Sequence, residues 1–284
     1  MTTAANAGSG GGRSVLVTGA TSGIGLVASR MLAANGFRVF GGAYPTEDPA
    51  PLREAGGTPI ALDVTDAASV RRARDEIAAA LGGAPLWGLV NNAGIVGAGP
   101  IEYVDVAEMR RVFEVNVFGL VEATQAFLPQ LRQSKGRIVN MSSLSALLAV
   151  PFLAPYNASK SAVEAISDSL RREVEHFGVA VVIIEPGVTR TPLWRHADAI
   201  DLGPFRESPY AAALERVHGT AVRKGGKGQP PENVARAIVQ ALTDARPPTR
   251  IRVQRKLKAK IRYSLLPLLP DRLIDRLVAD RVWR

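Results

Sequence analysis

Residues 18–25 have the sequence Thr-Gly-Ala-Thr-Ser-Gly-Ile-Gly, between a short apolar run at Ser14–Val17 and a helical pattern from about Gly23 to Asn35. In a strand–loop–helix unit, glycine lets a pyrophosphate approach the backbone, and the helix start supplies N–H donors and a positive dipole end. A glycine-rich turn that binds nothing is the alternative. The TGxxxGxG spacing differs from GxGxxG and lacks the Gly-Lys-Ser/Thr of a P-loop. It favours nucleotide binding over nucleoside triphosphate hydrolysis.

Short apolar runs and helical patterns alternate along the rest of the chain. The apolar runs are continuous, which is typical of strands covered on both faces. Strands are predicted at Ser14–Val17, Phe37–Gly41, Pro59–Leu62, Leu86–Val90, Arg137–Met141, Val179–Ile184 and near Arg250–Val253, and helices at Gly23–Asn35, 66–81, 106–132, 156–177 and Glu232–Thr243. This alternation predicts an α/β fold, a single doubly wound Rossmann-type parallel sheet with helices on both faces.

The 284 residues suffice for one such domain with a full hydrophobic core. We expect a disordered N-terminal arm at 1–13, a Rossmann-type catalytic domain at 14–249 and a basic amphipathic segment at 250–284. The net charge of +9 is concentrated at the C-terminal end, because residues 246–284 hold twelve Lys/Arg and three Asp/Glu. The rest of the chain is therefore neutral, and its overall basicity says little about what the domain binds.

Composition excludes several classes of protein. The chain has no cysteine, which excludes disulfide scaffolds, thiolate zinc sites and cysteine nucleophiles. Its three histidines, His176, His196 and His218, form no metal-binding motif, so no metal is expected. Neither a signal peptide nor an uncharged apolar stretch of membrane-spanning length is recognisable. These features predict a cytoplasmic protein.

Polar residues follow three of the predicted strands, at the carboxyl edge where open α/β sheets bind ligands. Asp63 ends the third strand, Asn91-Asn92-Ala93-Gly94 ends the fourth, and Ser143 ends the fifth. A hydroxyl at Ser143 could polarise a substrate carbonyl. Turn formation and helix capping are the alternative roles for each of these side chains.

Tyr156 and Lys160 are four residues apart on a predicted helix, so they share one face of it. A phenol is a poor acid or base at neutral pH, but a neighbouring cation favours the phenolate and lowers its pKa. This pair therefore suggests acid–base chemistry, although such spacing also arises by chance.

Taken together, these motifs resemble the short-chain dehydrogenase/reductase family. TGATSGIG, Asp63, NNAG, Asn116, Ser143, Tyr156-xxx-Lys160 and Pro186-Gly187 match it in order and spacing over residues 14–192, and more loosely to about 245. Ser167–Val174 together with Glu185-Pro186-Gly187 resembles the retinol and 17β-hydroxysteroid dehydrogenase branch. The resemblance implies an NAD(P)-dependent oxidoreductase that interconverts a hydrophobic alcohol and its ketone or aldehyde.

The resemblance also implies roles for single residues. Tyr156 would exchange a proton with the substrate oxygen, Lys160 would lower the pKa of Tyr156 and hold the nicotinamide ribose, and Ser143 would orient that oxygen. Asn116 would support a proton-relaying water, which completes the catalytic set. Substrate binding would involve Ser143 and Tyr156. Cofactor binding would involve Thr18, Gly19, Ser22, Gly23, Ile24, Gly25, Asp63, Val64, Asn92, Ala93, Gly94, Tyr156, Lys160, Pro186, Gly187, Val188 and Thr191. Within this set, Asp63 and Val64 would face the adenine and Asn92 the adenosine ribose.

Cofactor choice in such folds depends on the residue after the second strand, where an acid binds the ribose 2′-OH and arginine binds a 2′-phosphate. This chain has Phe40-Gly41-Gly42-Ala43-Tyr44 there, and Ser22 occupies a position where phosphate-binding relatives place a cation. The absence of a cation tilts the prediction toward NAD, with Arg38 as the residue to consider if NADP is preferred. A substrate lid is expected at about 192–226, whose aromatic and aliphatic residues suit an apolar substrate.

The C-terminal segment combines a Lys/Arg cluster with leucines and with apolar residues at helical spacing. It could form a peripheral contact with an anionic membrane, or its apolar face could pack on the domain. Nucleic-acid binding has little support, since no recognised module is present. We expect a homodimer or homotetramer. The rival function is a non-catalytic protein that senses nicotinamide nucleotides, a class that commonly loses the Tyr156 or Lys160 equivalent.

Overall fold

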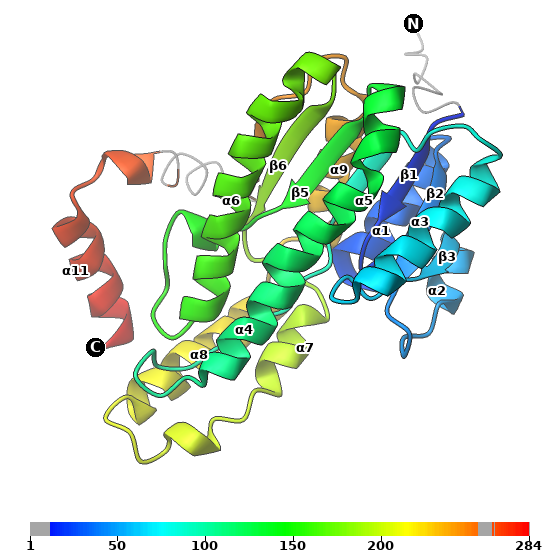
Figure 1. The fold of residues 1–284 in the computed structure, drawn as a ribbon. Helices are drawn as coiled ribbons and strands as arrows, with labels where there is room; N and C mark the ends of the chain where they lie inside the picture. The colour runs from blue at the N-terminus through cyan, green and yellow to red at the C-terminus, as the bar shows by residue number, and fades with distance from the viewer. Residues whose placement is uncertain (1–11, 255–262, 264, 284) are drawn as a thin grey trace, which may run out of the picture.

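The computed structural model describes residues 12–254, 263 and 265–283. Its centre is a parallel sheet of seven strands in the order β3-β2-β1-β4-β5-β6-β7 (Figure 1). The strands are β1 (Ser14–Val17), β2 (Arg38–Ala43), β3 (Thr58–Ala61), β4 (Gly88–Asn91), β5 (Arg137–Met141), β6 (Ala180–Pro186) and β7 (Arg250–Val253). The predicted doubly wound, Rossmann-type sheet is confirmed. The chain order reverses beside β1, at the switch point where such sheets bind ligands.

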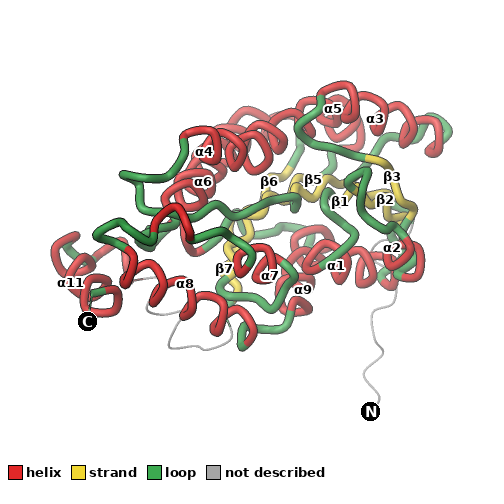
Figure 2. Tube along the Cα trace, turned by 90° about the horizontal axis from the view of Figure 1, so that it is seen from below, coloured by secondary structure: helices red, strands yellow, loops and turns green. Residues whose placement is uncertain are grey.

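Helices cover both faces of the sheet (Figure 2). One face carries α1 (Gly23–Ala34), the short α2 (Ala50–Glu54) and α9 (Pro231–Thr243); the other carries α3 (Ala67–Leu81), α5 (Gly119–Ser134) and α6 (Ala154–Val174). Side chains alternate along each strand. On β1, Val15 and Val17 join the core under α1 and α9, while Leu16 joins the core under α3 and α5. β1 is thus apolar on both faces, as its continuous apolar run predicted.

The helix expected at 106–132 is divided in the structure. It consists of α4 (Val106–Phe113), a π-helical turn at Glu114–Phe118, and α5. The extra residue of a π-turn cannot be recognised in an apolar pattern of helical period, which is why the sequence predicted one helix. The π-turn contains Asn116, one of the predicted catalytic residues.

The domain boundary predicted at residue 249 is wrong by one strand. β7 pairs in parallel with β6, with Arg250 opposite Ile183 and Val253 opposite Pro186. The Rossmann-type domain therefore includes the first four residues of the segment 250–284, which the sequence predicts as a separate tail. Its short run, Arg-Ile-Arg-Val, alternates charged and apolar residues because β7 is an edge strand.

The region predicted as the lid contains α7 (Leu193–Asp198), a 3₁₀ turn at Gly203–Phe205 and α8 (Ala211–Gly226). Past a second 3₁₀ turn at Leu266–Leu268, the C-terminal helix α11 (Asp271–Val282) lies beside α8 (Figure 2). Its residues Val278 and Val282 belong to an apolar cluster with lid residues. Most of the N-terminal arm predicted at 1–13 and the Lys/Arg cluster at 255–262 lie outside the described residues. Across the described part of the chain, every helix is too short or too polar to span a bilayer.

Candidate active site

The glycine-rich loop between β1 and α1 is shaped by close backbone contacts. Gly19 has φ +61° and Gly23 has φ +54°, both in the left-handed region that favours glycine. A Cβ on Gly25 would lie 2.2 Å from the carbonyl oxygen of Gly19, so only glycine fits where α1 begins. Ser22, the N-cap of α1, is extended and makes no side-chain hydrogen bond to the first turn in the described structure. The loop and helix start thus fit a bound pyrophosphate.

Thr18 and Asn92 connect this loop to the end of β4. Thr18 Oγ1 accepts hydrogen bonds from the backbone N–H of Asn92 and of Ala93, at 3.0 and 2.9 Å. Asn92 Nδ2 donates to the carbonyl oxygens of Thr18 and Gly19, at 2.9 and 3.0 Å. The expected contact of Asn92 with an adenosine ribose stays a prediction, to which these hydrogen bonds add a structural role. Its amide nitrogen stabilises the glycine-rich loop, a role closer to the turn-forming alternative.

Asp63 and Val64 follow β3 at the same edge of the sheet. Asp63 Oδ1 accepts hydrogen bonds from the backbone N–H and the hydroxyl of Thr65, at 2.9 and 2.7 Å. Val64 is buried against the start of α5, where a Cβ on Gly119 would come within 2.7 Å of it. Asp63 Oδ1 thus stabilises a local turn and Val64 packs under the same edge, while their contact with an adenine stays a prediction.

Tyr156 and Lys160 lie on one face of α6, with Lys160 Nζ 5.7 Å from the centre of the Tyr156 ring. Lys160 is 5% exposed, and its ammonium donates to the carbonyl oxygen of Met141, at the end of β5, at 2.9 Å. Ser143 lies two residues after Met141 and caps the 3₁₀ turn Leu144–Ala146. Its Oγ accepts a hydrogen bond from the Ser145 N–H at 3.1 Å. The end of β5 and the start of α6 thus bring Ser143, Tyr156 and Lys160 together.

Burial sets the electrostatics of these groups. It raises the pKa of Tyr156 above its ordinary value, and a hydrogen bond with Ser143 offsets part of that rise. It also lowers the pKa of Lys160 to about 8, because a buried ammonium loses hydration. Burial of the phenol thus sets the direction of the Tyr156 pKa shift, and the lowering that the resemblance implies for Lys160 is not among its causes.

Asn116, in the π-helical turn, is connected to the group of Ser143, Tyr156 and Lys160 through hydrogen bonds with residues next to that group. Its Oδ1 accepts from Ile95 N–H at 2.8 Å, while Nδ2 donates to the Ile95 carbonyl and to Ser159 Oγ at 2.9 and 3.0 Å. Gly94 lies against it, since a Cβ there would be 3.2 Å from Asn116 Oδ1 and 3.6 Å from Lys160 Nζ. The NNAG end of β4, the π-turn and α6 therefore meet beside Lys160.

The segment after β6 completes the edge of the site. Pro186 ends the strand, and Gly187 N–H donates to the Val253 carbonyl at 2.9 Å. Gln229, which is 3% exposed, donates through its side chain to Thr189 Oγ1 and the Val253 carbonyl. The start of the lid lies beside the glycine-rich loop, because a Cβ on Gly23 would be 3.4 Å from both Thr191 and Pro192. Val188, another predicted cofactor residue, is exposed.

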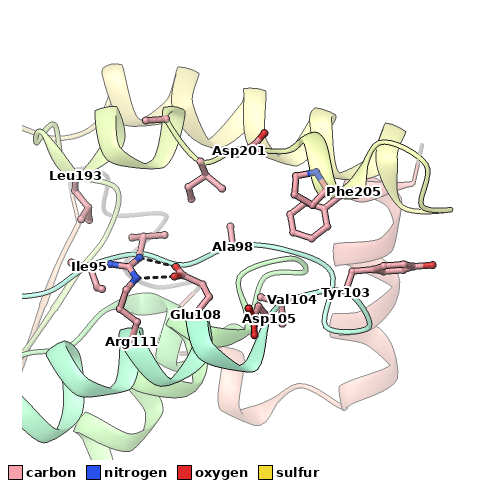
Figure 3. Close-up of a pocket in the computed structure, with 14 residues that line it drawn as sticks. Ile95, Ala98, Tyr103, Val104, Asp105, Glu108, Arg111, Leu193, Asp201 and Phe205 are labelled. Atoms are coloured by element: carbon pink, nitrogen blue, oxygen red, sulfur yellow. Dashed lines mark hydrogen bonds and ion pairs between the residues drawn. The ribbon is translucent and has the colours of Figure 1, made fainter.

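A cavity of about 630 Å³ opens between the chain after NNAG, α4 and the lid (Figure 3). Its walls are mostly apolar, with a two-fold hydrogen-bonded ion pair between Glu108 and Arg111 on α4 at 2.7 and 2.8 Å. The lining residues are Ile95, Val96, Ala98, Tyr103, Val104, Asp105, Glu108, Arg111, Leu193, Ala199, Ile200, Asp201, Pro204 and Phe205. Ile95 is bonded to Asn116, so this cavity borders the group around Lys160. No cluster suited to a metal ion occurs among the described residues.

Sequence reasoning missed an acidic residue near the end of β2. Glu47 Oε2 accepts hydrogen bonds from Thr21 Oγ1 in the glycine-rich loop at 2.5 Å and from Tyr44 N–H at 3.3 Å. Its position 22 residues after Gly25 was the available signal, because Rossmann folds place their ribose-binding acid about 20 residues beyond the glycines. Arg38, by contrast, is at the opposite end of β2, with its guanidinium over the Phe40 ring.

Comparisons with known proteins identify the family. A family model described as short chain dehydrogenase matches residues 13–200. The NADPH-dependent 3-dehydrocapnine reductase of Ornithobacterium rhinotracheale is 36% identical over 274 residues, 93% of this chain and 95% of that protein. Retinol dehydrogenase 16 of Mus musculus is 34% identical over 281 residues, 93% of this chain and 87% of that protein. A solved short-chain dehydrogenase from Streptomyces avermitilis is 31% identical, with a TM-score of 0.73 over 90% of this chain and 95% of that one.

The chain belongs to the short-chain dehydrogenase/reductase family. It is an NAD(P)-dependent oxidoreductase, so the expectation of an enzyme is confirmed at that level.

Proposed function

We propose that the protein interconverts a hydrophobic alcohol and its ketone or aldehyde, with Tyr156 as the acid–base residue. The supporting observation is the position of the apolar cavity beside Ile95 and Asn116, next to the group formed by Ser143, Tyr156 and Lys160. The bound nicotinamide would supply or accept the hydride, which is chemistry that protein side chains do not provide.

In reduction, the Tyr156 hydroxyl gives its proton to the carbonyl oxygen as the hydride reaches carbon, and in oxidation it takes the proton back. A phenol whose pKa is raised by burial holds its proton at neutral pH, which suits the reductive direction. Lys160, whose ammonium lies 5.7 Å from the centre of the Tyr156 ring, would return a proton to Tyr156. Ser143 would donate to the same substrate oxygen.

The substrate class is inferred from the cavity walls. A space of about 630 Å³ is in the usual range of small-molecule sites, and its apolar residues would bury an aliphatic or alicyclic body. Phe205 and Leu193 from the lid face Ile95 and Ala98 across it (Figure 3). A panel of apolar and sugar-like ketones with each cofactor tests this class. Apolar ketones should oxidise the reduced cofactor with the higher kcat/KM, and preference for sugar-like substrates would contradict the proposal.

We further propose that the enzyme prefers NAD(H) to NADP(H). Glu47 supports this preference, because its carboxylate lies between the glycine-rich loop and the end of β2. An acid at that position binds a ribose 2′-OH and repels a 2′-phosphate. One relative, the 3-dehydrocapnine reductase, is NADPH-dependent by name, so the preference is inferred from this chain's own Glu47.

Titration of the protein with NADH and NADPH checks the cofactor preference. Wild-type protein should bind NADH at least about tenfold more tightly, a difference of about 1.4 kcal/mol. Glu47→Gln should narrow that ratio by removing the charge, while Asp48→Asn, which neutralises the adjacent carboxylate, should leave it unchanged. Tighter binding of NADPH by the wild type would reject the preference.

A further inference from the structure

A second cavity of about 570 Å³ lies close to the first, beside α6. Its walls include Ile101, Val150, Phe152, Tyr210 and Trp283, the residue that directly follows α11. Asn157 and Ser161 also border it, on a different face of α6 from Tyr156 and Lys160. The molecule therefore contains two largely apolar cavities. They lie on either side of the place where the lid packs against the segment before α6.

An aromatic wall separates the two cavities. Tyr103 lines the first cavity and meets the ring of Tyr210, which lines the second, edge-on with ring centres 6.0 Å apart. Phe205 of the first cavity and Phe152 of the second belong to one buried cluster. Gly99 lies between them, since its N–H donates to the Phe152 carbonyl at 2.8 Å and a Cβ on it would be 2.9 Å from the Phe205 ring.

The end of the C-terminal helix supports this wall from outside. The Trp283 ring packs against Phe152 and Tyr210, with ring centres 6.2 and 6.4 Å apart. Val282 is 4% exposed in the same cluster, and its carbonyl accepts a hydrogen bond from Arg216 of α8 at 2.9 Å. Tyr210 is held on its other side, because its hydroxyl donates to Glu102 at 2.9 Å.

Phe152 is held in an unusual conformation at this wall. Its φ is +68°, in the left-handed region that a bulky side chain rarely adopts, and the surrounding structure must stabilise it. Phe152 lies only four positions before Tyr156 in the chain. A residue that packs on Phe152 therefore acts on the wall of the substrate site and on the segment that leads into the catalytic helix.

We infer that Trp283 is a positioning residue that limits the length of substrate the enzyme accepts. By packing on Phe152 and Tyr210, it keeps the aromatic wall closed, and the alkyl chain of a substrate in the first cavity ends there. Moving the wall would join the two cavities and extend the apolar site. This inference rests on the proposed apolar substrate class.

A series of methyl ketones from hexanone to tetradecanone tests the inference by steady-state kinetics. For the wild type, KM should fall with each added methylene and then stop falling where the chain meets the wall. With Trp283→Ala, KM should continue to fall past that length, by about fourfold for each further methylene that is buried. The kcat values and the Kd of the reduced cofactor should remain as in the wild type.

Three variants make the experiment specific. Trp283→Phe keeps a ring at the wall and should restore the wild-type length limit. Leu277→Ala removes an exposed side chain of the same helix and should leave the limit unchanged. Tyr210→Leu alters the wall itself and should also extend the limit, so the test does not depend on one variant that fails to fold.

Two results would overturn the inference in distinguishable ways. A Trp283→Ala variant with the wild-type length limit, or with all KM values scaled by one factor, would show that Trp283 has only a structural role. A wild-type enzyme that reduces no ketone of the series would reject the proposed substrate class, and the inference with it.

Discussion

Burial of the Lys160 ammonium lowers the stability of the folded protein. An ammonium that is 5% exposed has lost most of its hydration, and its pKa falls from 10.5 to about 8. That shift corresponds to a cost of roughly 3 kcal/mol in the charged form, because one pKa unit is about 1.4 kcal/mol. This buried ammonium lies where the proposed reaction needs a cation next to Tyr156.

Lys160→Met should therefore abolish turnover and stabilise the protein without cofactor. At pH 7 the free energy of unfolding should rise by about 2 kcal/mol, since the loss of the hydrogen bond to Met141 costs about 1 kcal/mol. Between pH 8 and 10.5 the unfolded chain keeps the lysine proton that the folded protein has lost. Wild-type stability should consequently rise with pH relative to the variant across that window. Urea unfolding of both proteins at pH 7 and pH 10 measures this, and a variant less stable at pH 7 would contradict it.

Single residues also show what the sequence could predict. The motifs correctly placed Ser143, Tyr156 and Lys160 near one another, because the ends of parallel strands and the start of the next helix share an edge. The orientation of Asn92 could not be predicted, since an asparagine after a strand fits a turn and a ligand equally well. Which partner it takes depends on the Gly19 carbonyl, and that contact exists only in the folded loop.

Among the elements, β7 is attached to the rest of the domain by ion pairs, one of which involves a buried carboxylate. Glu185 of β6 is fully buried, and Arg252 of β7 donates to its Oε2 at 2.5 Å. Arg250 bridges Glu164 and Asp168 of α6 at 3.0 and 2.9 Å. Burial raises the pKa of Glu185, while the hydrogen bond from Arg252 lowers it. An edge strand of only four residues thus gains much of its attachment from ion pairs.

Arg252→Ala should destabilise the protein by about 3 kcal/mol, because it removes the nearest partner of a buried carboxylate. The double variant with Glu185→Gln should regain part of that loss, since no buried charge remains. Arg72→Ala is the matched control: it breaks an exposed pair with Asp66 at 3.4 Å and should cost less than about 1 kcal/mol. Chemical denaturation measures all three, and equal effects of Arg252→Ala and Arg72→Ala would contradict the assignment.

At the level of elements, apolar patterns predicted the strands well and the irregular segments poorly. All seven strands were predicted, six of them from continuous apolar runs, which are typical of strands covered on both faces. The pattern missed α2, which has five residues, and it merged α4, the π-turn and α5 into one helix. The boundary at 249 failed because Arg250 and Arg252 carry charges whose partners are far away in the sequence.

In the whole molecule, the C-terminal segment has two different faces. Val278 and Val282 pack in the cluster with lid residues, as expected if the apolar face covers the domain, while Leu273 and Leu277 are exposed. The Lys/Arg cluster at 255–262 lies outside the described residues, so peripheral membrane contact stays a prediction. The homodimer or homotetramer stays a prediction too. The sequence could predict a helix here. The contact of Trp283 with Phe152 and Tyr210 could not be predicted, because it depends on the fold of the lid, whose sequence has no regular apolar pattern.

Kinetics of Tyr156→Phe with the best ketone of the panel test the central claim most directly. The change removes only the hydroxyl, so the ring, the buried Lys160 and the cofactor site should remain intact. The proposed acid–base role predicts that kcat falls by at least about 10²-fold while the Kd of the reduced cofactor is unchanged. A Tyr156→Phe enzyme that turns over at the wild-type rate would contradict the account.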